Sequence, residues 1–197
     1  RDIWGIPVGF PAMDKLTGGF QQTELVILSG EPGIGKSILG VQIGMRMAET
    51  SPGVIYSMEM GQMALARRMV SGAASVPTRS LKSGRMNNDD WSKIVAAIEK
   101  INKLNLFISD SSGWTTTSLR ADLARLKAQY GIKWFVLDYM YLLNDGTGQN
   151  EIERTALASK GLKSICKELD LAGLAIHSMN KAGIGSSGGD TLDNNAL

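Results

Sequence analysis

The residues best suited to chemistry in this chain are Lys36 and Ser37, which follow a glycine-rich segment. Residues 30–37 read GEPGIGKS and fit the pattern G-x-x-x-x-G-K-[ST]. Glycines let successive backbone N–H groups turn toward phosphate oxygens, and a following helix adds its N-terminus. In such a loop the lysine contacts the β- and γ-phosphates, and the serine hydroxyl is offered to Mg²⁺. The predicted phosphate-binding residues are Gly30, Glu31, Pro32, Gly33, Ile34, Gly35, Lys36, Ser37 and Ile38.

Two carboxylates stand at the ends of apolar runs. Asp138 ends the run WFVLD, and a buried strand of this form can deliver a carboxylate to the magnesium side of a phosphate site. Glu59 follows the run GVIYS and is the candidate to orient and polarise an attacking water. Taken alone, each would be a surface or capping residue. Together with the phosphate loop they predict a magnesium ligand, Asp138 beside Ser37, and a catalytic base, Glu59.

The elements that must position these residues are predicted from the apolar pattern. The runs at residues 24–29, 53–57, 104–109, 133–138 and 173–177 are mostly continuous, which is typical of strands covered on both faces. Helical periodicities lie between them, so the order favours a mostly parallel α/β sheet with helices on both faces. One helical stripe, preceded by Asn87 or Asn88 as its cap, contains Trp91, Ile94, Val95, Ile98 and Ile101.

Composition excludes two classes of protein, the small secreted domain held together by disulfides and the membrane protein. One Cys, Cys166, cannot form an internal disulfide, and one Cys with one His makes a structural zinc site untenable. Apolar runs are too short to span a bilayer and no signal peptide opens the chain, so no membrane association and a cytoplasmic location are expected. The net charge of +2 argues against non-specific nucleic-acid binding through bulk charge but allows a local DNA track.

Several further stretches resemble the RecA-like ATPase domain of DnaB-type replicative DNA helicases. Residues 57–60 (SMEM) are similar to the family's S-L-E-M, and residues 109–113 (SDSSG) to its D-D-S-S-G. Residues 9–19, 84–91 (GRMNNDDW) and 137–142 (LDYMYL) also match family segments. The resemblance implies a RecA-like P-loop fold with at least five strands. It implies one domain over residues 1–197, with residues 1–20 leading into the first strand.

The resemblance also implies site residues. ATP and Mg²⁺ are the expected cofactors, Glu59 is the general base and Lys36 acts on the phosphates. Family members carry a γ-phosphate sensor after the last strand, where this chain reads HSMNK, so His177 or Ser178 fills that position depending on the register. Two loops, residues 144–154 and 180–195, would line a channel for single-stranded DNA. The candidate DNA contacts are Arg154, Lys181, Gly183 and Gly185.

The partners implied by the resemblance are single-stranded DNA, further copies of the chain in a ring that is a hexamer, a primase and a helicase loader. Because the family's arginine-finger segment would follow Leu197, a domain incomplete at its C-terminus and weakly active in isolation is expected. Arg67 and Arg68 are interpreted as a solvated or subunit-facing edge. Two alternatives stay open. One is a recombinase-like or clock-type regulatory ATPase, and the other is a nucleotide-dependent scaffold module.

Overall fold

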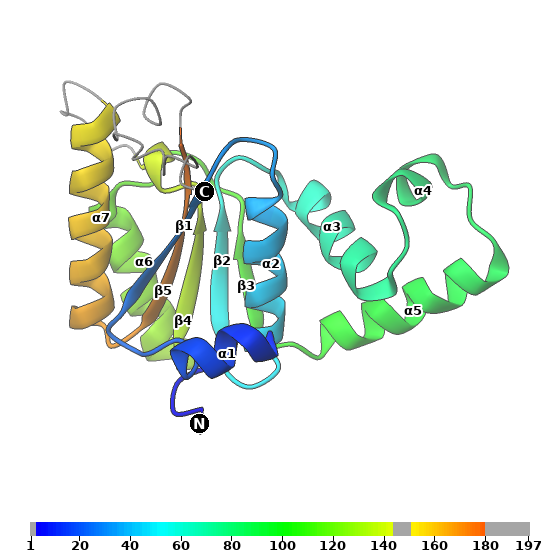
Figure 1. The fold of residues 1–197 in the computed structure, drawn as a ribbon, viewed down its shortest axis with the longest axis horizontal. Coiled ribbons are helices and arrows are strands. Elements are labelled where there is room, and N and C mark those ends of the chain that lie inside the picture. The colour runs from blue at the N-terminus through cyan, green and yellow to red at the C-terminus, as the bar shows by residue number, and fades with distance from the viewer. Residues whose placement is uncertain (1–2, 144–150, 180–197) are drawn as a thin grey trace, which may run out of the picture.

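The fold is organised around a five-stranded parallel sheet, described in a computed structural model for residues 3–143 and 151–179 (Figure 1). The strand order is β1-β5-β4-β2-β3, and every pairing is parallel. The five apolar runs are confirmed as strands, each to within two residues. Their bounds are β1 Leu25–Gly30, β2 Gly53–Ser57, β3 Leu106–Ser109, β4 Trp134–Asp138 and β5 Ala172–Ser178.

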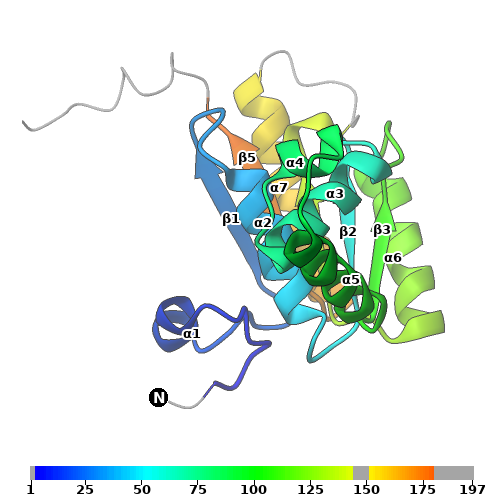
Figure 2. The ribbon, with the colours of Figure 1, turned by 90° about the vertical axis from the view of Figure 1, so that its right-hand side faces the viewer.

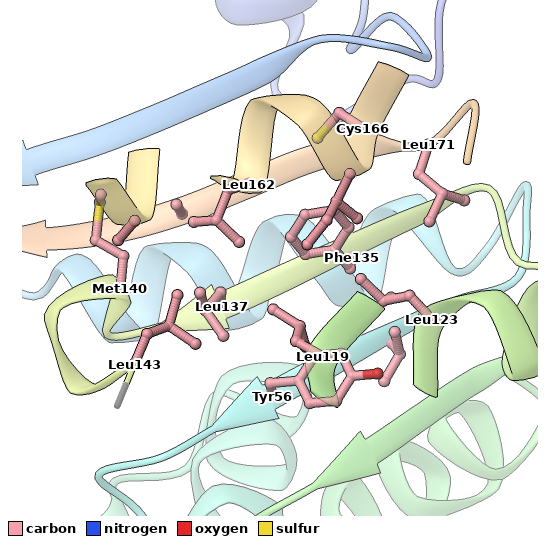
Figure 3. Packing of buried hydrophobic residues seen from close by; sticks show 14 of the residues in the cluster. Tyr56, Leu119, Leu123, Phe135, Leu137, Met140, Leu143, Leu162, Cys166 and Leu171 are labelled. Carbon is pink, nitrogen blue, oxygen red and sulfur yellow. The ribbon is translucent and has the colours of Figure 1, made fainter. Parts of the chain in front are cut away.

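Helices cover both faces of the sheet, as the continuous apolar runs predict. Helices α6 (Thr116–Tyr130) and α7 (Glu151–Glu168) lie on one face, and α2 (Lys36–Met47) and α3 (Gln62–Ala74) lie on the other (Figure 1). All five residues of β4 are buried, and they alternate between the two layers. Phe135 and Leu137 pack against α6 and α7 in the cluster of Figure 3, which also holds Cys166. Trp134 and Val136 pack on the α2 side.

The segment before the first strand folds against the amino end of the sheet. Its short helix α1 (Pro11–Thr17) lies at the opposite end of the strands from the glycine-rich loop (Figure 1). The buried Asp14 carboxylate accepts hydrogen bonds from the backbone N–H groups of Val8 and Gly9, at 2.8 and 3.0 Å. Val8 itself is buried in the cluster on the α2 side, so the segment is anchored to the core.

Three helices between β2 and β3 form an arm beside the sheet, and we use that name for α3, α4 (Thr78–Ser83) and α5 (Asn88–Asn102). In Figure 2, which faces this side, α5 lies in front of the sheet. Asn87 caps α5: its Oδ1 accepts from the Asp90 N–H at 2.7 Å, and the Asp90 carboxylate accepts from the Asn87 N–H at 3.3 Å. The predicted helix is therefore confirmed, and its cap is Asn87.

The remaining described element is a short 3-10 turn, η1 (Met140–Leu142), which follows β4. Within residues 3–143 and 151–179, no helix combines the length and the hydropathy that a bilayer crossing requires.

Candidate nucleotide-binding site

The glycine-rich loop joins the end of β1 at Gly30 to the start of α2 at Lys36. Gly33 and Gly35 have φ angles of +82° and +95°, a left-handed conformation that non-glycine residues rarely adopt. A Cβ atom at either position would meet no atom within 4 Å. The glycines are therefore required by the turn of the backbone, and the space beside it is open. This turn leads directly into the N-terminus of α2, where the helix dipole favours an anion.

The isoleucines of the loop are positioned differently from its polar residues. The Ile34 side chain is exposed, and Ile38, in the first turn of α2, is also largely exposed. Lys36 and Ser37 are buried despite being polar. The loop therefore turns its charged and hydroxyl groups inward, toward the edge of the sheet.

Lys36 lies between the loop and the end of β5. Its Nζ donates to the Glu31 carbonyl oxygen at 2.6 Å and lies 3.5 Å from the Ser178 hydroxyl. The parallel pairing of β1 with β5 sets Gly30 opposite Ser178, and the Met179 N–H donates to the Gly30 carbonyl at 3.0 Å. Strand pairing thus brings an ammonium group and a hydroxyl together at the mouth of the loop.

Ser37 and Asp138 meet beneath the loop. The Ser37 Oγ is 3.2 Å from Asp138 Oδ1 and 3.1 Å from the Tyr139 hydroxyl. Burial raises the pKa of Asp138 to about 6, and the nearby Glu59 carboxylate raises it too. The Ser37 hydrogen bond and the cations of Arg68 and Lys36 act in the opposite direction. A buried carboxylate with this environment is stabilised in its charged form by any added cation.

This donor set fits magnesium. Mg²⁺ prefers oxygen ligands and usually takes only one or two from the protein, with waters and phosphates supplying the rest. The described residues contain no cluster of three or more His, Cys, Asp or Glu side chains able to hold a metal by themselves. Ser37 and Asp138 would therefore hold the ion together with phosphate oxygens in the adjoining loop.

Glu59 stands at the rim of the same site. Parallel pairing of β2 with β4 sets Ser57 opposite Asp138, and the Met58 N–H donates to the Asp138 carbonyl at 2.8 Å. Glu59 is exposed and lies on the same cleft as the Tyr139 phenol, whose pKa is raised mainly by burial. A cavity of about 360 Å³ joins these groups, lined by Gly33, Gly35, Lys36, Ser37, Ile38, Glu59, Met60, Arg68 and Tyr139.

The two sensor candidates lie on opposite faces of β5. Side chains alternate along a strand, and Leu174 and Ile176 pack on the α2 side while Ala175 packs with α6 and α7. Ser178 accordingly shares the α2 side with Lys36. His177 faces the other way, with its Nδ1 3.3 Å from the Ser29 hydroxyl. The structure brings Ser178 to the cleft and does not bring His177 there.

Sequence reasoning missed three residues that line the cleft, Met60, Arg68 and Tyr139. Arg68, interpreted as part of a solvated or subunit-facing edge, lines the cavity and lowers the pKa of Asp138 more than Lys36 does. Its place at the cleft follows from the rotation of α3 about its axis, which buries the neighbouring Leu65 and Met69. Tyr139 carried no signal beyond its place directly after Asp138.

Of the four residues predicted to contact DNA, the structure describes one, Arg154. Arg154 is exposed in the first turns of α7, which begins at the end of the sheet where the strands terminate (Figure 1). Lys181, Gly183 and Gly185 lie outside the described residues, as do most positions of the two predicted loops.

The sequence is similar to those of curated proteins named as replicative DNA helicases. The replicative DNA helicase DnaB of Leifsonia xyli subsp. xyli is 32% identical over 180 residues, covering 90% of this chain and 39% of that protein. The replicative DNA helicase DnaC of Bacillus subtilis is 31% identical over 185 residues, covering 91% of this chain and 40% of that protein. The chain thus spans about two fifths of the length of these curated relatives.

Solved structures share the fold. A structure titled as a DnaB-like replicative helicase and its interactions with primase has a TM-score of 0.87 at 23% identity, covering 95% of this chain and 46% of that one. The ATPase domain of G40P also gives a TM-score of 0.87 at 23% identity, covering 94% of this chain and 68% of that one. The RecA-like fold is thereby confirmed. The family described as the DnaB-like helicase C terminal domain matches residues 5–184, and this chain belongs to that family.

Proposed function

We propose that this chain is the ATP-hydrolysing motor of a replicative DNA helicase, which couples Mg-ATP hydrolysis to translocation on single-stranded DNA. The observation that carries the proposal is the buried Ser37–Asp138 pair beside Lys36 and Glu59, in a chain of the DnaB-like family. Phosphate loop, metal ligands and base lie around one cavity, which is the arrangement that phosphoryl transfer to water requires.

Each residue has a distinct role in the proposed reaction. Backbone N–H groups of residues 30–38 and the Lys36 ammonium bind the β- and γ-phosphates. Ser37 and Asp138 would hold Mg²⁺, which would supply positive charge beside the phosphate oxygens. Glu59 orients a water for attack and accepts its proton. Ser178 contacts the γ-phosphate, because its hydroxyl lies beside Lys36.

The DNA-binding part of the proposal rests on family membership. Arg154, Lys181, Gly183 and Gly185 are proposed to contact the DNA backbone within a ring of identical subunits, a hexamer, in which a few residues per chain are repeated around one channel. A primase and a helicase loader are the proposed further partners, and the cytoplasm is the proposed location. The support is that the compared relatives are named replicative DNA helicases, and one similar structure concerns interactions with primase.

The alternatives are less well supported. A recombinase-like or clock-type regulatory ATPase is not favoured, because the matching family and the curated relatives are those of replicative helicases. A scaffold module that binds nucleotide without hydrolysis would leave the position of Glu59 beside the metal ligands without a use.

The test is ATP hydrolysis by the full-length gene product, measured with and without oligo-deoxythymidine. We expect DNA to raise the turnover rate several-fold and Lys36→Ala to lower hydrolysis by at least about 100-fold, since a charged contact to phosphate is lost. Lys93→Ala is the matched control, because Lys93 forms an exposed ion pair with Asp89 on α5. Hydrolysis that does not respond to DNA would contradict the helicase function. Hydrolysis that survives Lys36→Ala would contradict the site.

A further inference from the structure

Glu59 lies in a short turn between strand β2 and helix α3, and we call residues 58–61 the Glu59 turn. The Ser57 side chain, buried at the end of β2, donates its hydroxyl hydrogen to the Met60 carbonyl oxygen at 2.9 Å. The donor comes two residues before Glu59 and the acceptor one residue after it, so the hydrogen bond spans the turn. It fastens the Glu59 backbone to a strand in which every residue is buried.

A second contact holds the other end of the Glu59 turn. Gly61 is the N-cap residue of α3 and has no side chain with which to cap the helix. The backbone N–H of Gln62, the first residue of α3, donates instead to Asp110 Oδ2 at 2.8 Å. Asp110 follows β3, which pairs with β2, and its carboxylate also interacts favourably with the dipole of α3. The start of α3 is therefore attached to the edge of the sheet.

The backbone of the turn determines where the proposed base can lie. Glu59 is exposed and has a long side chain, so its carboxylate reaches the cleft only if the backbone presents it there. The neighbouring Met58 N–H donates to the Asp138 carbonyl oxygen at 2.8 Å, which ties the turn to the strand that ends at the proposed metal ligand. A displacement of about 1 Å in such a site can lower a rate about 100-fold.

We propose that Ser57 and Asp110 are positioning residues that hold the two ends of the Glu59 turn and so keep the Glu59 carboxylate at the cleft. This inference rests on the proposed ATPase function. Both residues belong to the described part of the chain and neither lines the cleft, so neither is assigned a contact with nucleotide or metal. Ser57 has the larger effect, because its hydrogen bond is partly buried and that of Asp110 is exposed.

The first test compares Ser57→Ala with Ser71→Ala in the full-length gene product. Ser71 is the matched control, because its hydroxyl donates to the Val76 carbonyl oxygen at 2.6 Å and closes a turn in the arm. Equilibrium binding of a fluorescent Mg-ATP analogue and single-turnover hydrolysis at saturating ATP are measured. For Ser57→Ala we expect binding within about twofold of wild type and hydrolysis lowered about 10- to 100-fold. For Ser71→Ala both should stay within about twofold of wild type.

Asp110 gives a second test that needs no substitution in the core. Asp110→Ala should leave binding unchanged and lower hydrolysis about three- to tenfold, because the start of α3 loses its acceptor. Asp110→Asn should restore hydrolysis to within about twofold of wild type, since an amide oxygen also accepts from the Gln62 N–H. Equal losses in the two variants would overturn the role of this hydrogen bond. If circular dichroism shows that Ser57→Ala does not fold, the Asp110 variants decide.

A double variant separates positioning from a direct role. If Ser57 acts through Glu59, Ser57→Ala changes the residual hydrolysis of a Glu59→Gln protein by less than about twofold. A tenfold or larger loss in that background, wild-type hydrolysis by folded Ser57→Ala, or a loss of nucleotide binding by folded Ser57→Ala would each overturn the inference alone. A wild-type protein that does not hydrolyse Mg-ATP would instead overturn the proposed function, and the inference with it.

Discussion

The carboxyl edge of the sheet and the arm both have regular patterns of apolar residues in their sequences. The apolar side chains are buried to different extents in the two regions. Every residue of β2 and β4 is buried, and these strands end at Ser57 and Asp138, beside the cleft. In the arm, only Ile94 and Ala97 of the fifteen residues of α5 are buried. Trp91, Val95 and Ile98, on the predicted apolar stripe, are 52%, 53% and 41% exposed.

The difference shows what an apolar pattern determines. In the strands, neighbours on two faces and in two pairings fix each residue, so the site at their ends is held rigidly. In α5, the periodicity and the Asn87 cap are enough to form the helix, with a small cluster of Ala74, Val76, Ile94 and Ala97 beneath it. An apolar pattern therefore identifies a helix or a strand, while the packing around each residue determines how much a substitution changes stability.

The largest expected effect is at the sheet edge. Glu59→Gln keeps the size of the side chain but removes the base, so hydrolysis should fall about 10²- to 10⁴-fold while Mg-ATP binding is retained. Single-turnover hydrolysis and equilibrium binding on the same preparation check this. Glu99→Gln on α5, outside the residues that line the cleft, is the control. Hydrolysis at the wild-type rate would show that another group activates the water.

The next effect is on stability. Leu162 of α7 is fully buried against the sheet, and Leu162→Ala should lower the free energy of unfolding by about 2–5 kcal/mol. Urea denaturation followed by circular dichroism measures this. A loss below about 1 kcal/mol would mean that the sheet side is not the better packed of the two regions.

A smaller effect separates the two faces of β5. Ser178→Ala should slow hydrolysis about tenfold, because a hydroxyl beside the γ-phosphate is lost. His177→Ala should change it less than about twofold, since its ring lies on the other face beside Ser29. Steady-state turnover of the two variants is compared directly. The reverse ranking would place the sensor at His177.

The smallest effect is expected in the arm. Val95→Ala removes an exposed apolar side chain and should change the free energy of unfolding by less than about 0.5 kcal/mol. Ile94→Ala, one residue earlier and buried, should cost about 2 kcal/mol or more. The same urea titration compares both. Equal losses in the free energy of unfolding for the two variants would show that the apolar stripe of α5 is covered in solution.

Much of the fold and of the cleft could be predicted because local sequence determines it. Continuous apolar runs identify strands buried on two faces, and the loop pattern identifies Lys36 and Ser37 without any tertiary information. Asp138 and Glu59 follow from the rule that parallel strands deliver their ends to one edge.

The rest depended on spatial relations that the sequence does not contain. A shift of one residue in strand pairing exchanges His177 and Ser178 between faces, so only the observed register favours Ser178. The position of Arg68 at the cleft could be predicted only by knowing how α3 is rotated about its axis. Tyr139 has its place in the cleft through a partner 102 residues earlier in the sequence, Ser37.

The most direct test of the central claim is a crystal structure of this protein with Mg²⁺ and a non-hydrolysable ATP analogue. The account predicts phosphates within residues 30–38, Mg²⁺ on the Ser37 hydroxyl next to Asp138, Ser178 beside the γ-phosphate, and a water between that phosphate and Glu59. Phosphates bound elsewhere, or a water held by a residue other than Glu59, would contradict it.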